Sequence, residues 1–334
     1  MDGSSTIALP HQLRRLTLFA DAAIGALRTL SLTTIAQPLG LMGQVAAQRL
    51  FDRMAGKLEF DASEMSGTEY VTHVASGNSP FIGIPVFASR VFRHSFIVIN
   101  RESGIEKPMD LEGRRVGVQL YTMSAAMWIR GMLQHDYGVD LSTISWVQGA
   151  IDGPGGHGSP TVLPLLKLPD VVNNESDRSL SQLLENGEID AIMSAVMPDG
   201  FGQNPDIVRL FPNFREVEAD YYRRTKIFPL MHLVVIRRDV YDDYPQVAKS
   251  LYDAFCRAKD ISLEHMKYTG ALRYMLPFLP ADLDEIEDIF GGDPWPFGIE
   301  ANRPTLEAEV QYMVEQDYIA KAMPIEDLFA PGVG

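Results

Sequence analysis

The densest run of cationic side chains lies at residues 90–94, where Arg90, Arg93 and His94 stand beside a predicted strand. A guanidinium holds a carboxylate through two parallel hydrogen bonds, so an arginine here could bind and orient an acidic ligand. An imidazole exchanges protons near neutral pH, which makes His94 a candidate acid or base. The alternatives are surface ion pairs for the arginines and a hydrogen-bonded core position for His94.

A second histidine and a carboxylate stand at the ends of predicted strands. His232 opens an apolar strand directly after Pro229-Leu-Met, and Glu64 closes a strand that runs into a helix. Imidazole and carboxylate groups are common general acids and bases, so both residues are candidate catalytic groups. A buried structural histidine and a local helix cap are the alternative interpretations of these two positions.

Two predicted helix starts carry hydroxyl groups that could meet an anion. Exposed N–H groups and the helix dipole favour a carboxylate at such ends, although simple capping explains the same residues. The Tyr-Tyr-Arg-Arg run at 221–224 offers a further guanidinium clamp or, alternatively, an ordinary solvated face. The candidate binding residues in these segments are Ser66, Tyr121, Thr122, Ser124 and Arg223.

The sequence gives no strong sign of a cofactor. Glu64, His94 and His232 would form a two-histidine, one-carboxylate metal set, but their wide separation in sequence does not demand one. Cys256 is the single cysteine, which excludes an intrachain disulfide and a cysteine-based zinc site. No glycine fingerprint of a nucleotide-binding loop is present. We therefore expect no cofactor, and a divalent metal stays an open alternative.

The 334-residue chain carries a formal charge of −15, from 29 basic and 44 acidic residues. This excess argues against non-specific binding to nucleic acid or to an anionic membrane, while a local arginine cluster could still hold a small anion. No apolar run approaches the ~20 residues of a membrane helix. Arg14 and Arg15 precede an apolar stretch, but Asp21 interrupts it and no cleavage site follows. We expect a cytoplasmic protein, either monomeric or homo-oligomeric.

Strand-like and helix-like segments alternate along the chain, which predicts an α/β fold. Ser66 with Glu69, and Ser179 with Gln182, have the spacing of capping boxes at helix starts. An extended strand that includes His94 would place it on the face opposite Arg93. Predicted helices cover 44–55, 124–133 and a long segment from 245, and predicted strands cover 16–19, 81–87, 94–100, 114–119, 189–193 and 232–236.

A series of motifs in a fixed order runs from residue 51 to residue 331. With these motifs the chain resembles the 4,5-dihydroxyphthalate decarboxylase family, within the wider group that is similar to type II periplasmic solute-binding proteins. The segments 19–27 and 148–169 depart from the family pattern, which leaves room for a different aromatic acid. The motifs are Phe-Asp-Ala-Ser-Glu-Met-Ser at 60–66, Ser-Pro-Phe-Ile-Gly-Ile-Pro-Val-Phe at 79–87, Ser-Arg-Val-Phe-Arg-His-Ser at 89–95, Met-Trp-Ile-Arg-Gly at 127–131, Asp-Tyr-Tyr-Arg-Arg-Thr at 220–225, Ile-Phe-Pro-Leu-Met-His at 227–232 and Pro-Trp-Pro-Phe-Gly at 294–298.

The resemblance implies a two-lobed fold with a ligand cleft between the lobes. Lobe 1 would comprise residues 1–104 and 226–334, and lobe 2 would comprise residues 105–225. The implied activity is non-oxidative decarboxylation of a hydroxylated aromatic dicarboxylate, with 4,5-dihydroxyphthalate as the expected substrate and protocatechuate and CO₂ as products. A non-catalytic binding protein or sensor for an aromatic carboxylate is the alternative.

The implied reaction assigns roles to the candidate residues. His94 and His232 are the expected acid and base, and Glu64 is a further candidate catalytic residue. Arg90 or Arg93 would hold the carboxylate that stays on the ring. The partner would be a small aromatic dicarboxylate, and neither nucleic acid nor a membrane is expected.

Overall fold

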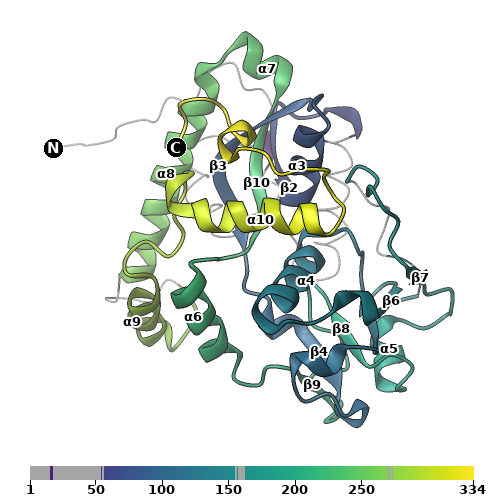
Figure 1. The fold of residues 1–334 in the computed structure, drawn as a ribbon. Helices are drawn as coiled ribbons and strands as arrows, with labels where there is room; N and C mark the ends of the chain where they lie inside the picture. Colours follow the sequence, from purple (N-terminus) through teal and green to yellow (C-terminus); the bar gives the residue numbers. More distant parts are fainter. Residues whose placement is uncertain are drawn as a thin grey trace. The chain divides into compact units, whose positions relative to one another are not determined.

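The computed structural model describes residues 16–17, 54, 56–154, 156, 162–268, 270, 272 and 274–334. The chain forms two compact units, which Figure 1 draws in the colours of the sequence. Unit 1 comprises residues 1–90, 230–307 and 323–334, and unit 2 comprises residues 91–229 and 308–322. None of the helices in the described ranges combines the length and the hydropathy that a membrane span requires.

The boundaries of the two units differ from those expected for the two lobes. The chain enters unit 2 after Arg90, rather than near residues 100–105, because strand β4 (Ile97–Asn100) pairs within the sheet of unit 2. Residues 308–322 also belong to unit 2. There Tyr312 packs on Gly131 so closely that a methyl group on Gly131 would lie 2.1 Å from the tyrosine ring.

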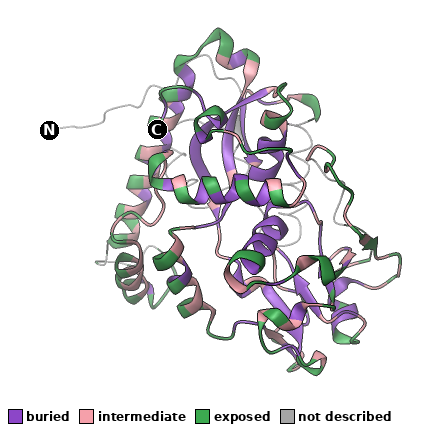
Figure 2. Cartoon of the chain, viewed as in Figure 1, coloured by how far each residue is buried: buried purple, intermediate pink, exposed green. Residues whose placement is uncertain are grey.

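Unit 1 is built on a four-stranded sheet in the order β1-β2-β10-β3. β10 lies between β2 and β3 and runs antiparallel to both, while β1 and β2 are parallel. Strands β2, β3 and β10 are largely buried (Figure 2). The strands are β1 (Leu16–Thr17), β2 (Ala62–Ser66), β3 (Phe81–Arg90) and β10 (Leu230–Arg237).

Apolar side chains of this sheet pack against a long amphipathic helix. Ile84 and Val234 belong to the same core cluster as Leu251 and Phe255 of helix α8 (Gln246–Lys267). This confirms the predicted long helix, with Pro245 at its N-cap. Further helices among the described residues of this unit are α3 (Gly67–Ala75), α7 (Arg238–Asp243), α9 (Leu279–Phe290) and the first residues of α10 (Arg303–Glu315).

Unit 2 contains a six-stranded sheet in the order β7-β6-β5-β8-β4-β9. The first four strands are parallel to one another, and β4 is antiparallel to both β8 and β9. The described residues of this unit include the helices α4 (Ser124–Tyr137), α5 (Leu180–Glu185) and α6 (Phe214–Thr225) and the end of α10. The remaining strands are β5 (Arg115–Val118), β6 (Ser145–Gln148), β7 (Val171–Asn173), β8 (Ala191–Met193) and β9 (Ile207–Arg209).

One of the two predicted capping boxes is confirmed. The Ser179 hydroxyl accepts a hydrogen bond from the backbone N–H of Gln182, and the Gln182 side chain accepts one from the backbone N–H of Ser179. The other is wrong, because Ser66 makes no side-chain cap bond and its Oγ lies 3.1 Å from the Thr68 hydroxyl. A serine beside a second hydroxyl has a competing partner for its oxygen.

The predicted strand over 94–100 begins three residues later than expected. The backbone N–H of Phe96 bonds the carbonyl of Arg93 at 3.2 Å, so His94–Phe96 forms a 3₁₀ turn and the strand starts at Ile97. The predicted opposition of Arg93 and His94 across a strand is therefore wrong. The predicted helix over 44–55 lies outside the described residues except for Met54, as do residues 18–27 and most of the segment 155–161.

Candidate active site

The pairing of β2 with β10 brings two predicted catalytic residues into contact. His232 lies opposite Ser66, and Val234 lies opposite Glu64, so Glu64 and His232 are diagonal neighbours on one face of the sheet. The His232 Nδ1 atom lies 2.6 Å from Glu64 Oε1. The Glu64 side chain is 1% exposed, whereas the His232 side chain is 28% exposed. A buried carboxylate thus holds an accessible imidazole.

The Glu64–His232 contact determines which ring nitrogen can meet a substrate. A carboxylate accepts hydrogen bonds, so the short contact is satisfied when Nδ1 carries the proton and donates it to Oε1. The second ring nitrogen, Nε2, then points away from the carboxylate. This is the arrangement by which a carboxylate orients a histidine for general acid–base work.

Hydroxyl residues flank His232 on both neighbouring strands. Ser66 of β2 and Ser89 of β3 both lie opposite His232 in the strand register. The pairing of β10 with β3 is irregular on both sides of His232, as in a β-bulge, and bulges re-aim side chains near active sites. Ser66 also precedes the first turn of α3, whose backbone N–H groups favour an anion.

Arg90 lies at the end of β3 in unit 1 and contacts the Pro-Trp-Pro-Phe-Gly turn of residues 294–298 in the same unit. Its guanidinium donates to Asn302 Oδ1 at 2.7 Å and to the Pro296 carbonyl at 3.4 Å. The Asn302 amide donates in turn to the carbonyls of Pro296 and Gly298. Arg90 is buried in these contacts and supports the turn, and its role as a carboxylate clamp stays a prediction.

His94 lies in the core of unit 2, whereas Glu64 and His232 belong to unit 1. The side chain is 0% exposed, and rings of Tyr137, Phe211 and Tyr221 pack edge-on against it at 5.2–5.9 Å. Burial, with a smaller effect of the Arg224 charge, lowers the pKa of His94 to about 4. An enclosed, neutral imidazole cannot reach a substrate in this structure, so the predicted acid–base role of His94 is not supported.

The burial of His94 predicts a pH-dependent stability without a catalytic effect. Above pH 6.5 the histidine is neutral in both states, whereas between pH 6.5 and about 4 only the unfolded state binds the proton, so stability falls as the pH falls through this window. His94→Phe should therefore reduce the loss of unfolding free energy between pH 7.5 and pH 5 by about 1–2 kcal/mol. Urea unfolding at the two pH values measures this, and loss of turnover in the folded variant would restore the catalytic assignment.

The two other predicted guanidinium clamps also lie in unit 2. Arg93 is buried, and its guanidinium lies over the Phe96 ring at 5.0 Å. Burial lowers the pKa of Arg93 to about 10, against the opposing effect of Glu218. Arg223 lies on α6 and is exposed to solvent. Neither residue belongs to the unit that holds Glu64 and His232.

The predicted binding residues at the start of α4 border a cavity of about 390 Å³ in unit 2. Tyr121 and Thr122 line it, whereas Ser124 is buried at the first position of the helix. The rest of the lining comes from Gln148, Asn173 and the segment 162–171. The structure therefore brings two of the three predicted residues of this group to one cavity.

Comparison with known proteins places these observations in a family. A 4,5-dihydroxyphthalate decarboxylase of Comamonas testosteroni is 34% identical over 261 residues, which are 76% of this chain and 77% of that protein. A protein of the same name from Pseudomonas putida is 36% identical over 180 residues, covering 53% of this chain and 68% of the relative. The chain belongs to the 4,5-dihydroxyphthalate decarboxylase family. No family model matches the chain.

Solved structures confirm the predicted fold class of this decarboxylase family member. The periplasmic aliphatic sulphonate-binding protein SsuA of Escherichia coli has a TM-score of 0.52 and 10% sequence identity, covering 96% of this chain and 97% of that chain. Protein AF1704 of Archaeoglobus fulgidus has a TM-score of 0.50 and 13% identity, covering 91% and 98%. At these identities the likeness concerns the periplasmic-binding-protein fold alone.

The three metal ligands considered from the sequence, Glu64, His94 and His232, do not form a metal site among the described residues. Glu64 and His232 lie in unit 1, and His94 lies in the aromatic core of unit 2. Within the described ranges, no group of three or more His, Cys, Asp or Glu side chains is arranged to hold a metal ion.

Sequence reasoning missed two buried ionisable residues. Arg130 stands in the motif at 127–131 but received no role, although a cation on an otherwise apolar helix face is itself a signal. Glu309 of α10 is buried, and Oε1 has no hydrogen-bond partner among the described residues. No pattern in the local sequence distinguishes Glu309 from its exposed neighbour Glu307.

Proposed function

We propose that this protein removes CO₂ from 4,5-dihydroxyphthalate and releases protocatechuate, without oxidation. Membership of the family supports the reaction. The observation that carries the proposal in the structure is the contact between buried Glu64 and accessible His232. This pair supplies an oriented proton-transfer group, which is the group that a non-oxidative decarboxylation requires.

The chemistry needs proton transfer and no electron acceptor. In 4,5-dihydroxyphthalate each carboxylate has a hydroxyl group para to it, and loss of a phenolic proton increases the electron density on the carbon that bears the carboxylate. A proton adds to this carbon, after which the carbon–carboxylate bond breaks, CO₂ leaves and the bonding electrons restore the aromatic ring. His232 is the proposed group that transfers the proton, and Glu64 holds the imidazole in position.

The carboxylate that stays on the ring needs a polar site, and the one that leaves does not. Ser66 lies opposite His232 in the sheet register and directly precedes α3, so its hydroxyl and the first N–H groups of that helix can donate to an anion. We assign the retained carboxylate to this end of α3. The departing carboxylate should contact fewer donors, because strong binding there would stabilise the ground state and not the transition state.

The proposal is tested with the purified full chain and 4,5-dihydroxyphthalate, by following CO₂ release and protocatechuate formation. Phthalate is the matched control substrate, because it has both carboxylates but no para hydroxyl, and we expect no turnover of it. Failure to convert 4,5-dihydroxyphthalate, with or without added divalent metal, would overturn the proposal. Tight binding of the acid with recovery of the intact compound would instead support a binding protein or sensor.

Four further expectations accompany this proposal. The substrate is a small aromatic dicarboxylate, as in the names of the relatives. A cytoplasmic location and a homo-oligomeric state stay predictions, and size-exclusion chromatography with light scattering measures the second. The reaction as written balances with proton transfer alone, so we expect equal rates before and after treatment with a chelator.

A further inference from the structure

The cavity in unit 2 lies at the carboxyl ends of three adjacent parallel strands. Tyr121 and Thr122 follow β5, Gln148 ends β6, and Asn173 ends β7. The register aligns these ends, because Gln148 pairs with Val118 on one side and with Asn173 on the other. Ligands of open α/β sheets bind outside the carboxyl ends of the strands, so this position is suited to a ligand.

A directed chain of amide hydrogen bonds forms the polar side of the cavity. The backbone N–H of Tyr121 donates to Gln148 Oε1 at 2.8 Å, and Gln148 Nε2 donates to Asn173 Oδ1 at 3.1 Å. This direction settles the orientation of both amides, and the Asn173 NH₂ group is then turned away from Gln148. The polar side therefore offers hydrogen-bond donors from the Asn173 side chain.

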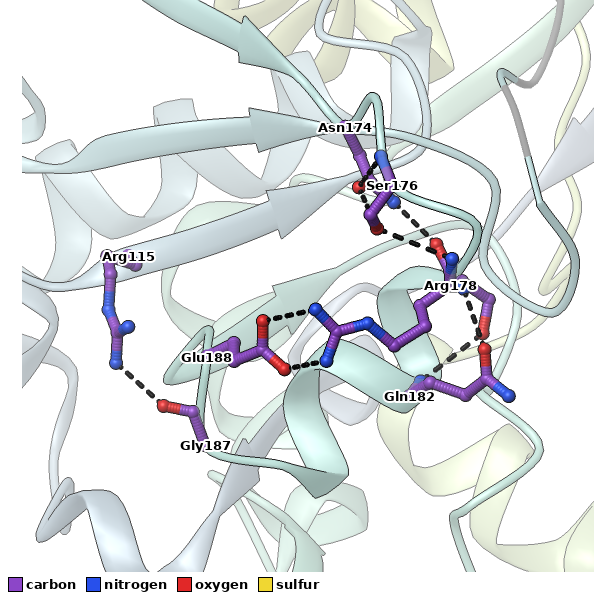
Figure 3. A network of polar contacts seen from close by, with 8 residues as sticks. Arg115, Asn174, Ser176, Arg178, Gln182, Gly187 and Glu188 are labelled. Carbon is purple, nitrogen blue, oxygen red and sulfur yellow. Dashed lines mark hydrogen bonds and ion pairs between the residues drawn. The ribbon is translucent and has the colours of Figure 1, made fainter.

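The residues after Asn173 anchor this side of the cavity. Asn174 Oδ1 accepts hydrogen bonds from the backbone N–H and the hydroxyl of Ser176, and Asn174 Nδ2 donates to the Arg178 carbonyl at 2.6 Å (Figure 3). Arg178 forms a two-fold ion pair with Glu188. A wall held in this way needs little reorganisation when a ligand binds.

The opposite side of the cavity is apolar. It is formed by Leu163, Leu165, Leu168 and Val171, together with two prolines of the same segment. Some of these side chains remain open to water, and Leu168 is 84% exposed. An apolar side facing a few donors fits a flat ring with polar substituents, because the ring covers the leucines while its oxygens meet the donors.

A buried cation lies directly behind the Tyr121 wall. The guanidinium of Arg130 lies 3.7 Å from the centre of the Tyr121 ring and donates to the Tyr121 carbonyl at 2.9 Å. Its other bonds go to Gln316 Oε1 and the Tyr318 hydroxyl, so all three acceptors are neutral. Among the described residues no carboxylate forms an ion pair with Arg130, and its charge adds to the positive end of α4. The cavity is therefore suited to an anion.

We propose that this cavity binds the ring of a hydroxylated aromatic carboxylate, with Arg130 as the cation that supports its Tyr121 wall. The inference rests on the proposed function, which defines two compounds of this chemistry: the substrate 4,5-dihydroxyphthalate and the product protocatechuate. It assigns to Gln148, Asn173 and Arg130 a role in recognition of the acid, which the sequence did not indicate.

Leucines of one segment provide a matched pair of variants. Leu165 lines the cavity, whereas its neighbour Leu166 is 60% exposed and does not line it. Leu165→Asp places a negative charge against the bound acid, and Leu166→Asp places the same charge on the same segment outside the cavity. Leu168→Asp is the second test variant, since substitution of a largely exposed side chain is not expected to prevent folding.

Isothermal titration with protocatechuate measures binding in each variant. Titration with 4,5-dihydroxyphthalate is done in the His232→Gln background, where we expect turnover to be strongly reduced. We expect Leu165→Asp and Leu168→Asp to weaken binding of one or both acids by about tenfold, and Leu166→Asp by less than about twofold. An effect on the substrate alone, with a raised KM, identifies a substrate site, and an effect on protocatechuate alone identifies a product site. Equal affinities in all three variants for both acids would overturn the inference.

Two more measurements test whether the cavity recognises the aromatic ring and whether the Arg130 charge contributes to binding. Maleate carries the same pair of carboxylates without a ring, so binding of maleate as tight as that of the aromatic acids would contradict a ring site. Arg130→Met removes the charge and should weaken binding of the acids by about tenfold, with partial recovery in Arg130→Lys. Wild-type turnover reports on the proposed function separately, so a cavity that does not bind the acids in an active enzyme contradicts this inference alone.

Discussion

His232→Gln should lower kcat for 4,5-dihydroxyphthalate by about 10²–10⁴-fold, the usual contribution of a positioned general acid or base. Glutamine keeps an N–H donor for Glu64, so the pair of side chains can still make a hydrogen bond while the proton-transfer group is lost. We expect KM to change little, because the retained carboxylate is assigned to the end of α3. Steady-state measurement of protocatechuate formation tests this.

His73→Gln is the matched control for this substitution. His73 is a half-buried histidine of α3 in the same unit, and its ring packs against Phe81 away from the Glu64–His232 contact. The kcat of His73→Gln should stay within about twofold of the wild-type value. Undiminished kcat in folded His232→Gln protein would remove the proton-transfer assignment even if the decarboxylation itself were established.

Glu64 acts through His232 and is a positioning residue. Glu64→Gln should lower kcat more than it changes KM, because the neutral amide no longer favours the same ring orientation and charge. Glu64→Asp keeps the charge on a shorter side chain, so partial recovery of kcat is expected. Equal losses in both variants, together with a lowered unfolding free energy, would indicate a purely structural role.

Glu309→Gln should make the protein less sensitive to alkaline pH. Glu309 is buried in α10, and burial raises the pKa of its carboxyl to about 8. Below pH 4.5 the group is protonated in both states, whereas between pH 4.5 and about 8 the unfolded state releases the proton and the folded state keeps it. Stability is therefore lost as the pH rises through this window and levels off above about 8.

A measurement at two pH values separates the effect of Glu309 ionisation from the cost of burying the glutamine amide, because that cost is the same at both pH values. Relative to wild type, Glu309→Gln should gain about 3 kcal/mol of unfolding free energy between pH 5 and pH 8. Glu307→Gln, on the same helix with an exposed side chain, should show no such gain. Urea unfolding of the three proteins at both pH values measures the difference. Parallel curves for wild type and Glu309→Gln would show that Glu309 is ionised in the folded state or is reached by water.

Much of the secondary structure followed from local sequence patterns. The strand β5, the helix α4 and the Ser179–Gln182 box agree with the predictions, because apolar spacing and capping depend on residues within one or two turns. The errors at Ser66 and His94 have a different origin. Ser66 has a neighbouring hydroxyl that competes for its oxygen, and the segment at His94 turns before it pairs in the sheet.

The sequence offered histidine, carboxylate and arginine side chains as candidates for proton transfer and anion binding, and the resemblance of its ordered motifs identified the family. Only the tertiary structure decided which of them meet. Glu64 and His232 are 168 residues apart and come together through the register of β2 with β10, and Arg90 meets Asn302 across 212 residues. His94 enters an aromatic core instead, although its sequence context looked equally favourable. Strand pairing and core packing join segments that are distant in sequence, so local patterns carry no record of these contacts.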